Sequence, residues 1–376
     1  MKSWAPKALK VLHFYKTYTP DFLTGVPRVI WEIAEGAARR GVRTDVLSLS
    51  RKPRSGAIKV ADHFSHEARL DLDLASTSLS VSAFGAFAKL ARDADVLHYH
   101  FPYPFTDVVH FATRVKKPVL VTYHSDIVRQ SLLLRAYRPL MHAFLDRADH
   151  IVATSPNYLA TSDVLQRYLA KASVIPIAID ANPKPSNALI DAWRNRLGAR
   201  FFLFVGVLRY YKGLPFLLEA AKLSGLPVII VGAGGNEALL RAAAVGIPNV
   251  AFLGQLPEAD KAALLALCYA FVFPSHLRSE AFGIALLEAA MSGKPMISCE
   301  IGTGTSYVNR HGETGLVVPP ANSAALADAM RTLWGDETTA RRMGDAARKR
   351  SEELFSVHKM AEAYVALYKT LTGQVK

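Results

Sequence analysis

Short apolar, β-rich runs alternate with helical patterns along almost the whole chain, and this alternation constrains the fold more than any other feature. In the first half, such runs predict strands at residues 11–15, 44–49, 96–99, 119–123, 151–154 and 173–175, with helices at 27–40 and 135–149. Repeated strand–helix units of this kind indicate an α/β fold with parallel sheets.

A second series of the same kind follows a proline-rich break. Three prolines fall within residues 175–185, which favours a linker over the interior of a helix or strand. Beyond it, strands are predicted at 201–205, 228–231, 250–253, 270–273, 295–298 and 315–318, and a helix at 357–372. A chain of 376 residues has room for two domains. We therefore expect two Rossmann-like, doubly wound domains, 1–178 and 182–356, facing each other across a cleft.

Composition excludes several classes of protein. Hydrophobic residues make up 51% of the chain and charged residues 20%, which is too apolar for a disordered or fibrous protein. The two cysteines, Cys268 and Cys299, cannot form a disulfide framework or a four-ligand zinc site, so we expect reduced thiols in a cytoplasmic protein. The longest apolar run, 262–273, is far shorter than the roughly 20 residues of a membrane-spanning helix. The first ten residues lack the apolar stretch of a secretory signal.

The positive charge is concentrated in the first half. The net charge is +13, of which residues 1–178 carry +9. Two clusters stand out, namely Arg39, Arg40 and Arg43, followed by Arg51, Lys52 and Arg54. A basic face can attract nucleic acid, anionic lipid or an acidic substrate, or can simply be solvated, and the charge count leaves these alternatives open.

Loops that follow strands are where ligands bind in such sheets. After the first strand, Gly25 precedes a helix with Pro27 in its first turn, whose N–H groups can face an anion. In the second domain, Gly206 is followed by Arg209 and Lys212, two cations suited to a diphosphate. The next loop, 232–235, resembles half of a dinucleotide fingerprint and keeps a nicotinamide-dependent dehydrogenase as an alternative, although the required acidic residue about 20 positions on is missing.

The most informative segment spans residues 274–289. Glu280 is predicted to lie in a loop, and a helix is predicted to begin at Phe282-Gly283-Ile284, with Glu288 more than one turn inside it. The N–H groups at the helix start suit a phosphate, one carboxylate suits sugar hydroxyls and the other suits a ribose diol. A nucleoside diphosphate sugar has these parts in this order.

Histidines gather at the ends of two first-domain strands. His98 and His100 would lie on one face of a strand, but no carboxylate or cysteine completes a metal site, so we expect no metal. His124 ends a strand and is a candidate for hydrogen bonding to a transferred sugar. We take His98, His100, Tyr123 and Asp126 as candidates for the acceptor side. The pairs Asp71/Asp73 and Asp93/Asp95 do not follow strands and are discounted as metal–diphosphate sites.

These motifs together resemble the retaining GT-B glycosyltransferases of family 4 over nearly the whole chain. The resemblance rests on the segment around Glu280 and Glu288, on the loop from Gly206 to Gly213, and on residues 311–319. Residues 11–18 and 300–306 are similar to bacterial O-antigen mannosyl- and rhamnosyltransferases that use GDP-sugars. The chain departs from the family pattern at Thr24, where a glycine is usual, and at Val207, where an arginine is usual.

The resemblance implies a GT-B fold and a role for each matched residue. Gly25 would lie against the donor diphosphate, which Lys212 and Arg209 would neutralise. Glu280 would bind hexose hydroxyls, Glu288 the ribose and His124 the C6 region of the sugar. Phe282, Gly283, Ile284 and Gly206 complete the expected donor site. The final helix, 357–376, is expected to pack back on the first domain.

The expected function is a retaining, metal-independent hexosyltransferase without a cofactor. It would move mannose or D-rhamnose from a GDP-sugar to a glycan or lipid-linked glycan acceptor in surface polysaccharide synthesis. We expect a cytoplasmic protein with a peripheral contact to the inner face of the cell membrane through its basic domain, and no nucleic acid partner. The alternatives are a UDP-sugar-using transferase, a nucleotide-sugar 2-epimerase and a non-catalytic binding protein.

Overall fold

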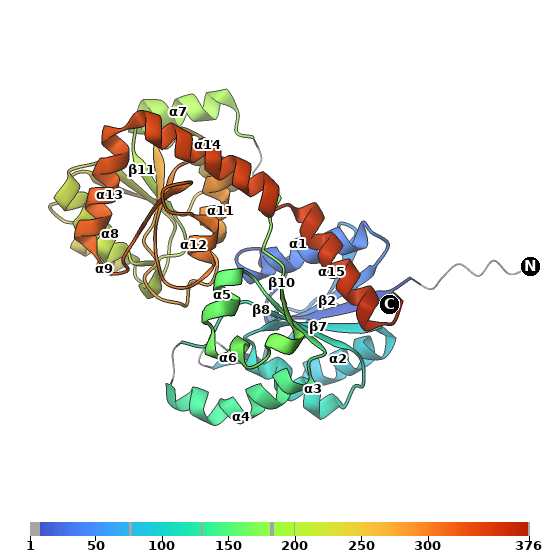
Figure 1. Cartoon of the computed structure of the whole chain (residues 1–376). Helices are drawn as coiled ribbons and strands as arrows, with labels where there is room; N and C mark the ends of the chain where they lie inside the picture. The colour runs from blue at the N-terminus through green and yellow to red at the C-terminus, as the bar shows by residue number, and fades with distance from the viewer. Residues whose placement is uncertain (1–7, 75–76, 129–130, 181–183, 199, 375–376) are drawn as a thin grey trace, which may run out of the picture. The chain divides into compact units, whose positions relative to one another are not determined.

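The structure is a computed structural model that describes residues 8–74, 77–128, 131–180, 184–198 and 200–374 (Figure 1). The chain divides into two compact units. The first unit comprises 1–154, 162–180 and 355–376, and the second comprises 155–161 and 181–354. The predicted first domain, 1–178, included the short segment 155–161, which clusters with the second unit although the residues on either side of it belong to the first.

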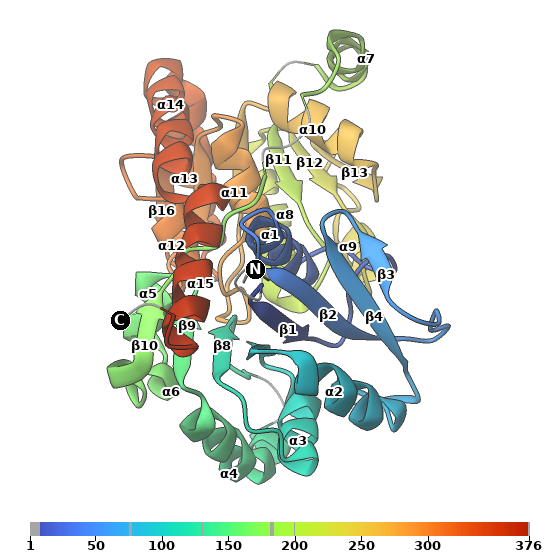
Figure 2. The ribbon, with the colours of Figure 1, turned by 90° about the vertical axis from the view of Figure 1, so that its right-hand side faces the viewer.

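The first unit is built on one large sheet. The order of its strands is β10-β9-β8-β7-β1-β2-β4-β3, and neighbouring strands are parallel except for β3 and β4. Figure 2 shows β1, β2 and β4 as neighbours in this sheet. The strands are β1 (Lys10–Phe14), β2 (Arg43–Ser50), β3 (Ile58–Val60), β4 (His63–Arg69), β7 (Val96–Phe101), β8 (Val119–Tyr123), β9 (His150–Ala153) and β10 (Ala172–Val174).

Helices cover both faces of this sheet because its strands are apolar on both sides. On one face, the Phe14 ring stacks on Phe87 of α2, 5.6 Å between centroids. On the other, His98 is covered by Tyr368 of α15, and α15 packs on α1. The helices of the first unit are α1 (Val26–Ala38), α2 (Ser82–Asp93), α3 (Pro104–Thr113), α4 (Ser131–Arg147), α6 (Asp163–Gln166), η1 (Leu169–Lys171) and α15 (Val357–Leu371).

A polar connection between β2 and α2 contains strands that the sequence analysis did not predict. Besides β3 and β4, it holds a separate antiparallel hairpin of β5 (Leu72–Leu74) and β6 (Thr77–Leu79). Strand β3 is at the sheet edge, and β5 and β6 lie outside the sheet. Strand β4 pairs with both β2 and β3 but has a largely polar sequence, so none of the four has the apolar run that marks a buried strand. Asp71 and Asp73 lie at this hairpin, where Asp73 accepts from Ser78. Asp95 accepts a hydrogen bond from the Lys10 N–H at the base of the main sheet.

The second unit has a six-stranded, all-parallel sheet in the order β13-β12-β11-β14-β15-β16. Its strands are β11 (Phe202–Val205), β12 (Val228–Val231), β13 (Val250–Gly254), β14 (Ala270–Phe273), β15 (Met296–Cys299) and β16 (Gly315–Val318). Its helices are α5 (Pro156–Thr161), α7 (Asn187–Leu197), η2 (Tyr210–Lys212), α8 (Leu214–Ser224), α9 (Glu237–Ala243), α10 (Glu258–Leu267), α11 (Ile284–Met291), α12 (Gly304–Val308), α13 (Ser323–Gly335) and α14 (Glu337–Leu354).

The order of these strands reverses between β11 and β14, which is the topological switch point of a doubly wound sheet. Strands β11 and β14 are fully enclosed by helices, as their uninterrupted apolar sequences require. The six strands predicted for this region are confirmed within one residue at each end. Cys268 and Cys299 are buried free thiols of this unit. In the described part of the chain, no helix is long and apolar enough to cross a membrane.

Candidate functional site

The loops at the switch point of the second unit are packed backbone against backbone. A Cβ atom added at Gly232 would lie 2.0 Å from the carbonyl oxygen of Gly206, and one at Gly234 would lie 2.6 Å from the carbonyl oxygen of Leu208. Side chains at Gly232 and Gly234 would therefore push the two loops apart. The glycine-rich loop after β12 has this packing role, which explains its composition without a nicotinamide cofactor.

A third loop, which follows β14, packs against the loop after β11 at Gly213. This glycine has a φ of +70° and begins α8, and a Cβ atom there would lie 1.9 Å from the carbonyl oxygen of Pro274. The backbone N–H of His276 donates to the Tyr211 carbonyl oxygen at 3.0 Å across the same junction. The loops after β11 and β14 thus form one rigid platform.

This platform carries a buried ion pair between Lys212 and Glu280. Each residue is only 9% exposed, and the Lys212 ammonium donates to Glu280 Oε2. The Ser275 hydroxyl donates to the same oxygen at 3.2 Å, and the ammonium lies 4.7 Å from the centroid of the Phe273 ring. Sequence reasoning assigned these two residues to different parts of a donor, and the structure brings them into direct contact. Arg209 is exposed at the start of η2.

The predicted helix start next to this pair is confirmed. Gly283, with a φ of +90°, precedes α11, and Ile284 is its first residue. Phe282 is buried, and Gly304 packs so closely on it that an added Cβ would lie 2.6 Å from the ring. Glu280 therefore lies in the loop and Glu288 in the second turn of the helix. The first N–H groups of a helix have no acceptor within the helix, so the start of α11 can bind an anion.

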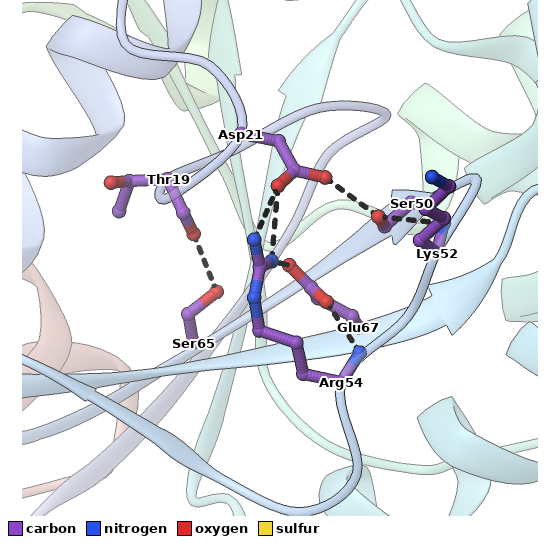
Figure 3. Close-up of polar contacts among 7 residues, drawn as sticks. All are labelled: Thr19, Asp21, Ser50, Lys52, Arg54, Ser65 and Glu67. Atoms are coloured by element: carbon purple, nitrogen blue, oxygen red, sulfur yellow. Dashed lines mark hydrogen bonds and ion pairs between the residues drawn. The ribbon is translucent and has the colours of Figure 1, made fainter.

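In the first unit, Gly25 is exposed at the start of α1 with a φ of +66°. The loop before it is held to the sheet edge by a polar network (Figure 3). Arg54 donates to Asp21 at 2.9 and 3.0 Å and also pairs with Glu67 at 2.5 Å. The Ser50 hydroxyl donates to Asp21 at 2.6 Å, and this hydrogen bond and Arg54 lower the pKa of Asp21. The network fixes the path of the chain toward Gly25, and nothing in the sequence pattern indicated it.

His124 follows β8 directly and is 5% exposed. Its backbone N–H donates to the Phe101 carbonyl oxygen at 2.9 Å, and its ring Nε2 lies 3.0 Å from His100 Nδ1. Burial lowers the pKa of His124 to about 3, so the ring is neutral at physiological pH. The structure thus ties His124 to the interior of the unit through one ring nitrogen.

The acceptor-side candidates lie deeper than a surface role requires. His98 and His100 are fully buried, and both ring nitrogens of each are hydrogen bonded within the protein. Neither can contact an acceptor in this conformation. Tyr123 is also buried, and its hydroxyl donates to Asp126, which accepts a second hydrogen bond from Ser162. Tyr123 and Asp126 therefore hold the segment after β8 in place.

His13, which the sequence analysis did not select, joins His98 and His100 in a buried group. One ring nitrogen from each lies within 4.8 Å of the others, a spacing that raises the question of a metal ion. However, both nitrogens of His98 are already occupied by Tyr368 and Thr122, and those of His100 by other imidazoles. The donor set therefore does not fit a metal ion well. Only the pairing of β1 with β7 reveals this group.

The first unit also contains an apolar hollow of about 510 Å³. Its lining comes from α2, α3, α4 and the β5–β6 hairpin and includes Phe84, Phe105 and Val108. Such a lining cannot solvate a phosphate or a sugar, so this hollow is not the donor site.

Comparisons with known proteins agree with one another. The profile described as "Glycosyltransferase Family 4" matches residues 23–182, and "Glycosyl transferases group 1" matches residues 187–350. The chain is 55% identical to the D-rhamnosyltransferase WbpZ of Pseudomonas aeruginosa over 93% of this chain and 92% of that protein. It is 46% identical to O-antigen chain mannosyltransferase C of Escherichia coli over 96% and 99% of the two chains. Its fold is similar to that of sucrose-phosphate synthase from Thermosynechococcus elongatus, with a TM-score of 0.81 at 22% identity, covering 98% and 100% of the two chains.

Proposed function

Because the chain belongs to the family 4 glycosyltransferases and has their GT-B fold, we propose that it transfers mannose or D-rhamnose from a GDP-sugar, with retention of configuration. The acceptor in this proposal is a glycan or lipid-linked glycan of a surface polysaccharide. That the protein is a hexosyltransferase follows from its family and its relatives. Two relatives that are 55% and 46% identical to the chain are named for transfer of these two sugars.

The observation that carries the donor assignment is the buried Lys212–Glu280 pair on its rigid platform, next to the start of α11. The leaving group of the reaction is a nucleoside diphosphate, which gains negative charge as the sugar bond breaks. In our proposal Lys212, Arg209 and the first N–H groups of α11 stabilise this charge, and no metal is required. Glu280 binds hexose hydroxyls and Glu288 the ribose.

The first unit supplies the remaining groups of the proposed reaction. Gly25, at the start of α1, lets the backbone approach the donor diphosphate, since a glycine has no side chain in the way. His124 hydrogen bonds to the transferred sugar. The neutral state of its ring suits hydrogen bonding rather than charge pairing.

A thermal-shift screen with GDP-, UDP- and ADP-sugars tests the donor, because a ligand that binds only the folded state raises the melting temperature. We expect the GDP-sugars to give the largest shift and Glu280→Ala to abolish most of it. A larger shift with UDP-sugars would favour the UDP-using alternative. Donor incubated with enzyme and no acceptor should stay unchanged at C2, whereas an epimerised sugar would identify an epimerase.

We also propose that the basic first unit makes a peripheral contact with anionic membrane from the cytoplasmic side. The two basic clusters are partly neutralised, because Arg39, Arg43, Arg51 and Arg54 form ion pairs with carboxylates of the same unit. The expected attraction is therefore weaker than the charge count suggests. Vesicles containing anionic lipid should sediment the full chain at low salt and release it at high salt. Absence of sedimentation at low salt would remove this part of the proposal.

A further inference from the structure

Three imidazole rings of the first unit form a hydrogen-bonded chain that ends at His124. His13 Nδ1 lies 3.0 Å from His100 Nε2, and His100 Nδ1 lies 3.0 Å from His124 Nε2. The sheet makes this alignment possible, because His13 pairs with His98 across β1 and β7, and His100 pairs with Thr122 across β7 and β8. His124 follows Thr122 by two residues and so continues along the same face.

All three rings are neutral at physiological pH. His13 and His100 are fully buried, and His124 is 5% exposed. Burial lowers the pKa of His13 and of His124 to about 3, and that of His100 well below its ordinary value. Within the residues that the structure describes, none of the three rings hydrogen bonds to a carboxylate that could hold an additional proton on the chain.

A neutral imidazole has one N–H and one lone pair, and this fixes how the chain can be protonated. His100 must donate one of its two hydrogen bonds and accept the other. The two hydrogen bonds therefore run in the same direction, and the proton positions of the three rings are coupled. Either all three rings carry the proton on Nδ1 or all three carry it on Nε2.

The surroundings of His13, at the buried end of the three hydrogen-bonded rings, favour one of these two protonation states. His13 Nε2 is buried and has no hydrogen-bond partner. Buried N–H groups without a partner are rarer in proteins than acceptors with an unused lone pair. The state with protons on Nδ1 leaves only a lone pair at His13 Nε2, so it is the favoured one.

The neighbouring His98 keeps the rings in their planes. Its centroid lies 4.5 Å from that of His13 and 4.5 Å from that of His100. His98 is itself held by the hydroxyls of Tyr368 and Thr122, at 2.8 and 2.7 Å. The chain is thus supported from the side by a residue that takes no part in it.

We propose that His13 and His100 are positioning residues that hold His124 in its Nδ1–H form, with Nε2 turned toward the interior. His124 then presents a hydrogen-bond donor, and not a base, to an oxygen of the transferred sugar. This role in transfer rests on the function proposed above, whereas the direction of the hydrogen bonds does not.

The direction of the two hydrogen bonds between the rings can be measured on the whole protein without any substrate. In protein labelled with ¹⁵N-histidine, a two-bond ¹H–¹⁵N correlation spectrum distinguishes Nδ1–H from Nε2–H rings, and single His→Leu variants assign the signals. We expect the proton on Nδ1 in His13, His100 and His124. A proton on Nε2 in any of them, or exchange between the two forms, would overturn the proposal. So would a transition metal that co-purifies and is removed by a chelator, since coordination needs the lone pairs that the chain uses.

Kinetics test the effect on transfer. We expect His100→Leu to lower kcat by about 10- to 100-fold with little change in KM for the donor, as for a misplaced catalytic group. His100→Asn should recover much of the loss, because its amide can donate to His124 Nε2. His110→Leu is the matched control, since His110 is buried in the same unit and bonds to Tyr99 instead.

An unchanged kcat in His100→Leu, or equal losses in His100→Leu and His100→Asn, would contradict the positioning role. If the wild-type protein transfers no sugar but the spectrum shows three Nδ1–H rings, the proposed function is wrong, whereas the inferred direction of the hydrogen bonds between the histidines still holds.

Discussion

At the scale of single residues, the buried Lys212–Glu280 pair links stability to donor binding. Two charges at 9% exposure have lost most of their hydration, and each depends on the other for compensation. When a donor binds, its diphosphate would become the partner of Lys212 and its hydroxyls the partners of Glu280, in place of the ion pair between the two side chains. The pair therefore keeps both side chains oriented for the ligand.

We predict that Lys212→Met lowers the free energy of unfolding by about 3–5 kcal/mol, because Glu280 is left buried without its cation. The double variant Lys212→Met/Glu280→Leu should recover much of this stability, since neither charge remains. Both variants should lose transfer activity. Chemical denaturation and donor turnover measure the two effects, and a double variant no more stable than the single one would contradict the prediction.

A second residue of interest is Asp107 in α3, which is fully buried. Its carboxyl accepts from the Tyr137 hydroxyl and from Thr106, but burial dominates and raises its pKa to about 8. The folded state therefore holds a proton that the unfolded state releases near pH 4. This group makes the protein less stable as pH rises from about 4 to 8.

We predict that Asp107→Asn removes this dependence. The variant should exceed the wild type in unfolding free energy by about 2–4 kcal/mol at pH 8.5, and the difference should shrink as pH falls toward 4. Urea denaturation across this range measures it. The exposed Asp345→Asn serves as control, and a difference that grows toward acid pH would show that the sign is wrong.

At the scale of elements, the two glycines that flank α8 show how surroundings decide the role of a glycine. Gly213 begins α8 and Gly225 ends it, with φ values of +70° and +71°. An added Cβ atom meets the Pro274 carbonyl oxygen at 1.9 Å in the first case and nothing within 4 Å in the second. The two positions have the same backbone conformation and differ in their surroundings.

We predict that Gly225→Ala lowers the free energy of unfolding by about 1–2 kcal/mol, because a residue with a side chain is strained in a left-handed conformation. Gly213→Ala should cost clearly more and should also weaken donor binding, because the loops after β11 and β14 must separate. Thermal unfolding and a donor titration compare the two variants. Equal costs would mean that the close approach to Pro274 is unimportant.

Elements differed in how well the sequence predicted them. The six strands of the second unit were predictable because uninterrupted apolar runs such as 270–273 reflect burial on both faces. The start of α11 at Gly283 was predictable from local residues. Strands β3 to β6 were missed because none of them is a continuous apolar run: β3 is an edge strand, β5 and β6 form a separate pair, and the interior strand β4 is largely polar. Residues 155–161, which form α5, were included in the predicted first domain, because the packing of α5 on α12 of the second unit is a long-range contact without a local pattern.

At the scale of the whole molecule, the end of the chain completes the first unit. Helix α15 buries Met360, Tyr364 and Tyr368, and its tyrosine hydroxyls bond to Thr122 and His98. The first unit is therefore assembled from three separate stretches of chain. Its stability depends on residues more than 200 positions away from the strands that they cover.

We predict that ending the chain after Leu354 removes protection from hydrogen exchange in β7 and β8, since the buried tyrosines and their hydrogen bonds are lost. Ending it after Thr372 leaves α15 complete and should leave the protection unchanged. Exchange measured by mass spectrometry compares the two truncations. Protection of β7 and β8 that survives the first truncation would contradict this role of α15.

The sequence by itself determined the order of the buried strands and their helices, the parallel core of both sheets and the residue types at the strand ends, because burial on both faces and helix starts leave local patterns. Only the tertiary structure decided which of these residues meet. The Lys212–Glu280 pair, the anchoring of the loop before Gly25 and the three-histidine chain all join residues from separate elements. Such contacts depend on strand order and register, which arise from the packing of the whole unit and leave no periodic signal in any one segment.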